Sequence, residues 1–314
     1  MYGVNGKELL RQYRNHMSDF ECWEQRSHAR EWLLFPENLG THLSIDETSL
    51  SRDELYTILT NKAAKGQKGS IVAIVAGTQA DSIIEVLRKL PESQRKKVQE
   101  ITLDMAGSMT QIAKRCFPQA TRVTDRFHVQ RLSVEALQDI RIKHRWEAID
   151  KENEALEHAK ATQTEYQPEI LTNGDTVRQL LARSRYVLYK RPKEWTISQK
   201  QRAELVFERF PDIKAAYELT IELSDIFTHT SDKIWGLTRL AKWHEKVRQL
   251  GFKAFNTVAR SIENHYQTIL NYFDNRSTNA SAESFNAKIK DFRAQFRGVR
   301  NIEFFLYRLT QLYA

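Results

Sequence analysis

The chain has 314 residues, of which 41% are hydrophobic and 28% charged, a composition that argues against a disordered chain and predicts a buried core. No apolar run reaches the length of a membrane span and no secretory leader is evident, so we expect a cytosolic protein. Cys22 and Cys116 are too few and too far apart for a disulfide framework or a thiolate zinc site. The net charge of +8 favours a polyanionic partner.

The first part of the chain, residues 1–40, is expected to be helical. Between Lys7 and Trp32, apolar side chains recur near the helical period. Pro36 and then Gly40 are residues that end helices.

The second part, residues 41–133, has the residue preferences of short strands and helices. Strands are predicted at Leu43–Glu47, Leu55–Thr60 and Ser70–Val75, and three short strands in succession indicate an antiparallel meander. A helix, a strand, a second helix and a further strand are then expected at 81–90, 100–104, 108–117 and 121–125. The order βββαβαβ with a mixed sheet predicts an α/β fold with a ribonuclease H-like core.

The third part, residues 134–273, is expected to be a large all-helical insertion into that core. Strand signals fade here, and charged stretches at helical spacing replace them. Asn173-Gly174, Pro192, Pro211 and Gly251 interrupt these stretches. Aromatic residues recur at intervals suited to helix packing, and ordinary core is their simplest interpretation.

Two aspartates end predicted strands of the core. Asp46 shares a strand face with Ser44, opposite Leu43 and Ile45, because successive side chains alternate. Asp104 stands at the carboxyl end of its strand, where open sheets commonly build their sites. For either aspartate alone, a helix cap or a solvated strand end is the competing interpretation.

The last part, residues 274–314, is expected to form one or two helices with a break at Gly298 and to complete the core. Its apolar side chains fall on one helix stripe: Phe285, Ile289, Phe292, Phe296 and Val299. The opposite stripe holds one acid with two amides and four cations: Glu283, Asn279, Asn286, Lys290, Arg293, Arg297 and Arg300. This pattern suits a metal site that runs out into a phosphate groove, and a merely solvated helix face is the alternative.

Three carboxylates from two strand ends and a helix match what phosphodiester chemistry requires. Two Mg²⁺ ions about 3.5–4 Å apart activate the attacking oxygen and stabilise the leaving one, and they prefer hard oxygen ligands. Asp46, Asp104 and Glu283 are therefore predicted to be the catalytic and metal-binding residues, with Mg²⁺ or Mn²⁺ as cofactor.

Four ordered blocks carry a resemblance to a known family. They are Ser44-Ile45-Asp46-Glu47, Leu103-Asp104-Met105, Val123-Thr124-Asp125-Arg126-Phe127-His128-Val129 and Asn279-x-x-x-Glu283-x-x-Asn286-x-x-x-Lys290. In these blocks the chain resembles the bacterial insertion-sequence DDE transposases of the ISL3 group. The resemblance runs from Leu43 to Tyr313, and in the insertion it includes Leu181–Tyr186 and Trp195. It implies DNA cleavage at transposon ends and transfer of the freed 3′-hydroxyl into a target strand.

Asp125 also ends a predicted strand and is an alternative second acid. In related transposases, an Asp followed by a His lies downstream of the second catalytic acid, and Asp125-Arg126-Phe127-His128 resembles that element. The resemblance therefore favours Asp104 as the acid and makes Asp125 and His128 residues that support the site. Asn279 and Asn286 are expected to support it as well, and the four cations Lys290, Arg293, Arg297 and Arg300 to contact DNA.

The resemblance also implies partners and a location. The substrates are double-stranded transposon ends and target DNA, the chain is expected to act as a homo-oligomer on DNA, and the location is the bacterial cytoplasm at the nucleoid, with no membrane. The residues before Asp46 lack the Cys-x-x-Cys zinc ribbon and the clear helix-turn-helix of full-length relatives. Two explanations are open: the module that recognises the transposon ends is truncated here, or a separate DNA-binding polypeptide supplies it.

Two other functions share parts of this pattern. A ribonuclease H-like resolvase would use the same acids for hydrolysis without strand transfer, and the long helical insertion argues against it. A catalytically inactive DNA-binding derivative of a transposase is the second alternative, and the intact Asp46, Asp104 and Glu283 argue against that.

Overall fold

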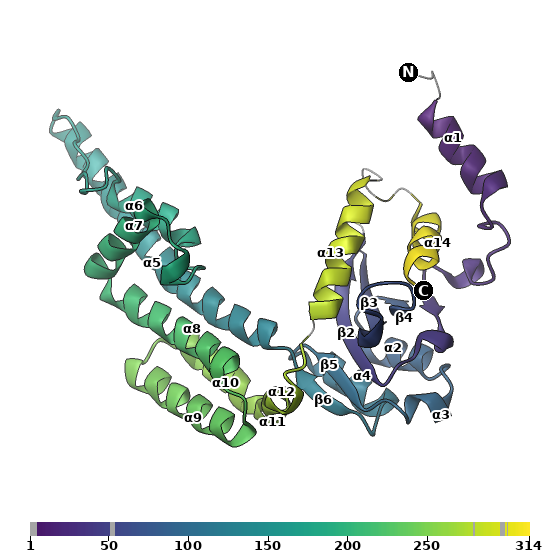
Figure 1. The fold of residues 1–314 in the computed structure, drawn as a ribbon. Helices are drawn as coiled ribbons and strands as arrows, with labels where there is room; N and C mark the ends of the chain where they lie inside the picture. Colours follow the sequence, from purple (N-terminus) through teal and green to yellow (C-terminus); the bar gives the residue numbers. More distant parts are fainter. Residues whose placement is uncertain (1–4, 51–53, 279, 296–298, 300) are drawn as a thin grey trace. The chain divides into compact units, whose positions relative to one another are not determined.

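The computed structural model describes residues 5–50, 54–278, 280–295, 299 and 301–314 (Figure 1). The chain divides into two compact units, one of residues 1–125 with 275–314 and one of residues 126–274. Within the described ranges, every helix is too short or too polar to cross a membrane.

A six-stranded mixed sheet forms the centre of the first unit. Its strands lie in the order β1-β4-β3-β2-β5-β6. The meander of β2, β3 and β4 is antiparallel as predicted, whereas β5 runs parallel to both β2 and β6. The strands are β1 (Trp32–Leu34), β2 (His42–Ser49), β3 (Leu55–Asn61), β4 (Ile71–Ala76), β5 (Glu100–Leu103) and β6 (Thr121–Thr124). This confirms the predicted fold class, a ribonuclease H-like mixed sheet accompanied by a helical region.

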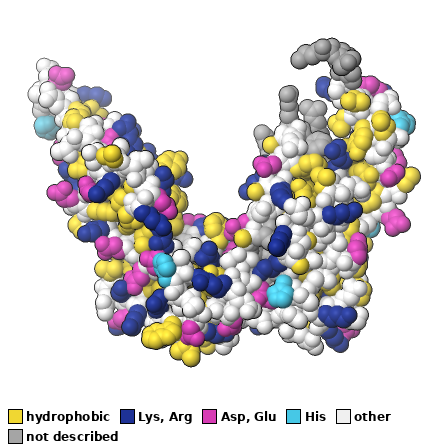
Figure 2. Space-filling model, in the orientation of Figure 1, with side chains coloured by type: hydrophobic (Ala, Val, Ile, Leu, Met, Phe, Trp, Pro, Cys, Tyr) yellow, Lys and Arg dark blue, Asp and Glu magenta, His cyan; other side chains and the backbone are white. Residues whose placement is uncertain are grey.

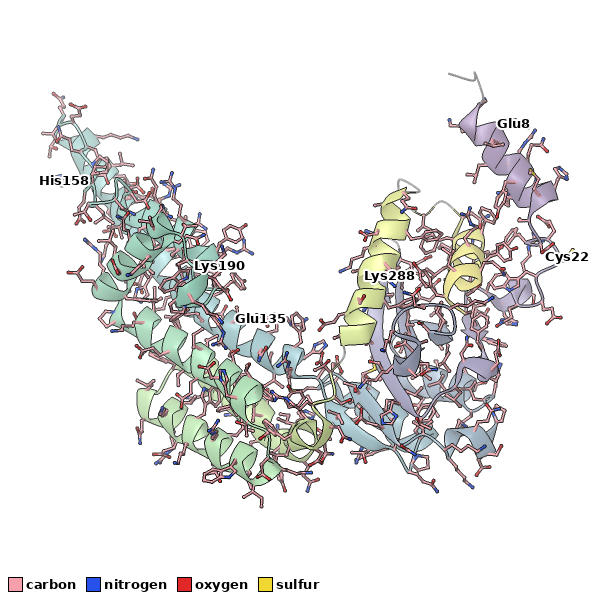
Figure 3. All side chains as sticks on the ribbon, in the orientation of Figure 1. Glu8, Cys22, Glu135, His158, Lys190 and Lys288 are labelled. Atoms are coloured by element: carbon pink, nitrogen blue, oxygen red, sulfur yellow. The ribbon has the colours of Figure 1, made fainter. Side chains whose placement is uncertain are left out.

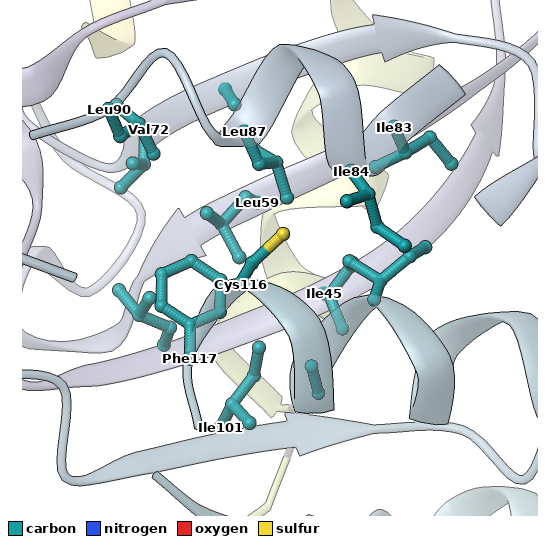
Figure 4. Close-up of a cluster of buried hydrophobic side chains, with 14 of the residues drawn as sticks. Ile45, Leu59, Val72, Ile83, Ile84, Leu87, Leu90, Ile101, Cys116 and Phe117 are labelled. Atoms are coloured by element: carbon teal, nitrogen blue, oxygen red, sulfur yellow. The ribbon is translucent and has the colours of Figure 1, made fainter. Parts of the chain in front are cut away.

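One face of the sheet is covered by α2 (Ala80–Leu87) and α4 (Gly107–Cys116), with the short α3 (Glu92–Arg95) between them in the chain. Leu43 and Ile45 of β2 face this core, as the alternation along the strand predicts. The buried side chains interdigitate around Cys116 (Figure 4). Burial raises the pKa of the Cys116 thiol to about 11, so this cysteine fills space and stays a thiol at neutral pH.

The opposite face is covered by α13 (Ala280–Gln295) and α14 (Ile302–Tyr313) (Figure 1). Phe285, Ile289 and Phe292 of α13 are buried on this face, which confirms the apolar stripe where the structure describes it. Val299 packs partly buried against the same core. The predicted break at Gly298, together with Phe296, lies outside the described residues.

The N-terminal segment corrects one prediction from the sequence. The helix expected from Lys7 to Trp32 comprises only α1 (Gly6–Gln12) and a π-helical turn at Tyr13–Met17. Beyond these the chain turns, passes through a 3-10 helix at Arg26–His28 and enters β1 at Trp32. Three aromatic side chains of this segment contact Phe304 or Tyr307 of α14: Tyr13, Phe20 and Trp23. The Phe20 and Phe304 ring centroids lie 5.1 Å apart.

The regular secondary structure described in the second unit is helical, and its first helix begins at Arg126, before the expected start of the insertion at residue 134. Its helices are α5 (Arg126–Ala161), α6 (Val177–Arg183), α7 (Ile197–Arg209), α8 (Pro211–His229), α9 (Lys233–Leu250), α10 (Lys253–Asn264), α11 (Tyr266–Leu270) and α12 (Tyr272–Asn275). Trp243 is fully buried in this unit and donates its indole N–H to the Leu219 carbonyl, 2.8 Å away. Gly236 allows a close helix contact, because a Cβ there would lie 2.6 Å from the ring of Phe273. The aromatic residues at helical spacing thus include true core residues.

Candidate active site

The parallel pairing of β2 and β5 brings two of the predicted acids to neighbouring strands. Ser44 lies opposite Thr102 in the register of these strands. Asp46 and Asp104 each follow two positions later, Asp46 within β2 and Asp104 just after the end of β5, and the charges of both act on Glu47. This alignment depends on the pairing of distant strands, which the periodicity of either strand alone does not reveal.

Asp125 ends the next strand at the same edge. Leu103 pairs with Thr124 in the parallel register of β5 and β6, and the Asp125 amide donates to the Leu103 carbonyl at 2.9 Å. Asp104 and Asp125 each come one position after this pair, so they follow the ends of two neighbouring strands. Its side chain is buried, with 1% of the residue exposed, whereas Asp46 and Asp104 are half-buried.

Hydrogen bonds orient the carboxylate of Asp46. Its Oδ1 accepts from the Glu47 amide at 2.9 Å, and its Oδ2 accepts from Asn286 Nδ2 at 2.7 Å. Asn286 lies one helical turn beyond Glu283 on α13. The helix that carries the third predicted acid is therefore attached to the strand that carries the first.

Asp104 has one carboxylate oxygen in a local turn. Its Oδ1 accepts from the Ala106 amide at 2.8 Å, just before α4 begins at Gly107. This bond forms an Asx turn before the helix and does not cap it, because the N-cap residue of α4 is Ala106 and no side chain caps that helix. The bond also fixes the direction of the carboxylate at the strand end.

Glu47 is a further acid at this edge, and its neighbours are the two aspartates. Its pKa is raised, first by burial and then by the negative charges of Asp104 and Asp46. Glu47 is part of the block that resembles the family, yet strand alternation assigns it to the face opposite Asp46. The sequence analysis therefore did not single it out, and only the strand order shows that it is near Asp104.

A buried ion pair attaches the start of α13 to the sheet. The Lys62 ammonium contacts Glu100 Oε1 at 3.1 Å and donates to Thr102 Oγ1 at 2.9 Å. The Ser277 hydroxyl is hydrogen-bonded to both Lys62 and Glu100, and the Glu100 side chain is 5% exposed. Ser277 lies three residues before α13, so this cluster positions the segment that leads to Glu283.

The remaining predicted site residues on α13 are only partly described. Glu283 and Lys290 are exposed, and Arg293 donates to the carbonyls of Ser49 and Leu50 at 3.3 and 3.4 Å. Among the residues that the structure describes, no group of three or more His, Cys, Asp and Glu side chains is arranged to hold a metal ion. The convergence of Glu283 with the two aspartates therefore stays a prediction. Three other predicted residues lie outside the described ones: Asn279, Arg297 and Arg300.

His128 belongs to the second unit and lies three residues after Asp125 in the sequence. It lies in the first turn of α5, partly buried, and its ring centroid is 5.9 Å from that of Phe127. Its predicted role beside the acids remains a proposal.

Comparison with known proteins identifies the family. The sequence model of the ISL3 group of DDE transposases matches residues 43–309. The chain belongs to this transposase family. The match begins in β2 and ends in α14, so it includes Asp46, Asp104, Glu283 and the whole helical unit.

A curated relative agrees with this family. The chain is 20% identical over 270 residues to the transposase for insertion sequence element IS1001 of Bordetella parapertussis. The aligned region covers 85% of this chain and 60% of that protein. This ISL3-family chain thus spans about 60% of the length of the relative that it matches.

Proposed function

We propose that this chain catalyses metal-dependent DNA cleavage at the ends of an insertion sequence and transfers the freed 3′-hydroxyl into a target strand. The observation that carries the proposal is the register of β2 and β5, in which Ser44 pairs with Thr102 two positions before Asp46 and Asp104. The hydrogen bond from Asn286 to Asp46 adds the helix of Glu283 to the same edge. Family membership supports the choice of DNA as substrate.

The donor set fits divalent magnesium or manganese. Asp46, Asp104 and Glu283 would hold the metal, as two ions in this scheme, because carboxylate oxygens are the hard ligands that these cations prefer. The pKa of Glu47 is raised first by burial and then by the negative charges of Asp104 and Asp46, and a divalent cation would offset the charge of these two aspartates. When bound, the ions would stabilise negative charge on the attacking and leaving oxygens.

The protein's own groups orient the carboxylates in advance. Asn286 fixes Oδ2 of Asp46, and the Ala106 amide fixes Oδ1 of Asp104. Preset directions lower the reorganisation needed when the phosphate arrives. Asp125 and His128 are proposed to support this arrangement, and His128 as imidazolium would contact the scissile phosphate.

The proposed partners are double-stranded DNA and further copies of this chain. Lys290, Arg293, Arg297 and Arg300 would contact phosphates, because a catalytic core that acts on many targets gains little from reading bases. Recognition of the transposon ends by a separate DNA-binding polypeptide remains part of the proposal.

A cleavage assay with purified protein tests this function. The substrate is a supercoiled plasmid with the inverted repeats that flank the gene, incubated with Mg²⁺. We expect strand cleavage at the repeats and joined products, and Asp46→Asn or Asp104→Asn should reduce both more than about 100-fold, the upper loss for residues that merely support metal ligands. Asp81→Asn is the matched control, because Asp81 is exposed on α2 and pairs with Arg115 at 2.9 Å.

Other outcomes would overturn parts of the proposal. Cleavage without joined products would indicate a resolvase-like nuclease, and DNA binding without cleavage would indicate an inactive derivative. If Asp125→Asn abolished cleavage while Asp104→Asn left it intact, the assignment of the second acid would be reversed. Equal activity of wild type and Glu283→Gln would remove Glu283 from the catalytic set.

A further inference from the structure

A small cavity in the helical unit is surrounded by cations. It has a volume of about 210 Å³ and is lined by Arg126, Arg191 and Lys193 among other residues. Arg126 is the first residue of α5. Arg191 and Lys193 lie in the segment between Lys190, which is labelled in Figure 3, and the start of α7. Elements far apart in the sequence thus bring three positive charges to one place.

The other lining side chains are polar. Ser224 of α8 contributes a hydroxyl that accepts from Arg191, and the Thr228 hydroxyl donates to the Ser224 carbonyl. His229 adds an imidazole at the end of that helix, and Gln130 of α5 adds an amide that can donate. The lining contains no Asp or Glu and no Trp, Tyr or Phe. Such a set offers donors to an anion and provides no aromatic surface on which a base would stack.

The three cations differ in how far their charge is balanced. Arg191 donates to Asp225 Oδ1 at 2.6 Å and to Ser224 Oγ at 2.8 Å, which holds its guanidinium in place. Arg126 donates to the Tyr272 hydroxyl at 3.2 Å, a neutral partner. Lys193 is exposed and has no hydrogen bond or ion pair with another described residue. The cavity therefore keeps a net positive charge that an anion would relieve.

A larger cavity of the same unit shows the opposite charge pattern. It has a volume of about 380 Å³, and its lining includes Glu152 and Glu169 beside Arg178 and Arg209. These groups neutralise one another, with Arg178–Glu152 at 3.2 Å and Arg209–Glu169 at 2.6 Å. Cationic and acidic side chains are also interspersed over the face drawn in Figure 2. A cavity lined by cations without acids therefore differs from its surroundings.

We propose that the cavity lined by Arg126, Arg191 and Lys193 binds a backbone phosphate of DNA. A phosphate diester accepts several hydrogen bonds at once, and guanidinium groups match its geometry. At about 210 Å³ the cavity is smaller than the roughly 300 Å³ at which small-molecule sites begin, so it suits one phosphate group rather than a whole nucleotide. Arg126 directly follows Asp125 in the sequence and is the first residue of the helical unit. The inference rests on the proposed function.

Duplex binding by the full chain tests this site without catalysis. The affinity for a fluorescent duplex is measured across a salt series in the absence of divalent metal. Lys193→Gln should lower the slope of log affinity against log salt by about one unit, because one phosphate contact is lost. Lys193→Arg should keep the slope. Lys200→Gln is the matched control, since Lys200 is an exposed cation on α7 outside the cavity lining.

The results separate this inference from the proposed function. If wild type bound no duplex, both would fail. If wild type bound with a salt slope that Lys193→Gln and Arg126→Gln left unchanged, only the phosphate site would fail. Phosphorus NMR with inorganic phosphate alone distinguishes a DNA site from a free-phosphate site. If Lys193→Gln lost phosphate binding but bound duplex as well as wild type, the cavity would be a free-phosphate site and the assignment to DNA would be overturned. Thermal unfolding checks that the variants are folded.

Discussion

At the residue scale, Glu47 shows how burial and neighbouring carboxylates affect one acid of the candidate active site. Burial raises its pKa, and the charges of Asp104 and Asp46 raise it further. A carboxyl group whose pKa is raised on folding stabilises the folded state fully only below its unfolded pKa. That contribution is lost as the pH rises through the folded pKa, because Glu47 must then ionise beside two carboxylates. The ionised form of Glu47 is therefore under electrostatic strain in the folded state, first from burial and then from its two acidic neighbours.

Replacement of Glu47 by Gln should relieve this strain. In metal-free buffer at neutral pH, Glu47→Gln is expected to unfold at a higher temperature than wild type. The difference should shrink as the pH falls below 4.5, the ordinary value for Glu, where Glu47 is protonated in both states. Thermal unfolding of both proteins across this pH range is the measurement. The exposed Glu204 supplies the control Glu204→Gln, and a stability difference that does not vary with pH would contradict the account.

At the scale of elements, α13 connects the candidate active site to the rest of the core. Its apolar stripe is buried on the sheet, and Lys288, which Figure 3 labels on this helix, donates to the Gly66 carbonyl at 2.6 Å. Arg293 caps the backbone carbonyls at the end of β2. Arg293 thus has a structural role in addition to its proposed contact with DNA, and its replacement would change both.

Lys290 is the better probe of the basic stripe on α13, because it is exposed. Lys290→Gln should weaken the binding of short duplexes about equally for all sequences and lower the salt slope by about one unit, as expected for a phosphate contact. Fluorescence anisotropy with two unrelated duplexes measures both effects. Lys97→Gln, at an exposed position before β5, is the control. Unchanged affinity and slope in Lys290→Gln would show that the stripe only keeps the helix soluble.

At the scale of the whole molecule, the periodic spacing of apolar residues predicted the strands and helices that have one buried face. The alternation of Leu43, Ser44, Ile45 and Asp46 predicted β2 and its faces, and the stripe of Phe285, Ile289 and Phe292 predicted the buried face of α13. These predictions hold because buried positions recur along a half-buried strand or helix with the period of that element. The three-residue β1 was missed, since Trp32 also fits the spacing of the apolar residues before it.

The spacing of apolar residues did not predict contacts between segments that are distant in the sequence. Asn286 binds Asp46 across 240 positions, and Lys62 binds Ser277 across 215. No local period links these residues, so their partners follow only from the strand order and from the placement of α13. The sequence predicted Asp46 and Asp104 as strand ends; Asp104 directly follows β5, whereas β2 continues past Asp46 to Ser49. The environment of Glu47 depends on Asp104, which follows the neighbouring strand.

The central claim is that the edge shared by β2 and β5 holds the catalytic metal, and anomalous diffraction tests it most directly. Crystals of the wild-type chain soaked in Mn²⁺ should give anomalous peaks between the carboxylates of Asp46 and Asp104, because Mn²⁺ takes the same oxygen ligands as Mg²⁺. The same soak of Asp104→Asn crystals should lose the peaks. Saturating Mn²⁺ that leaves this edge without a peak, or that gives peaks only at other residues, would contradict the account.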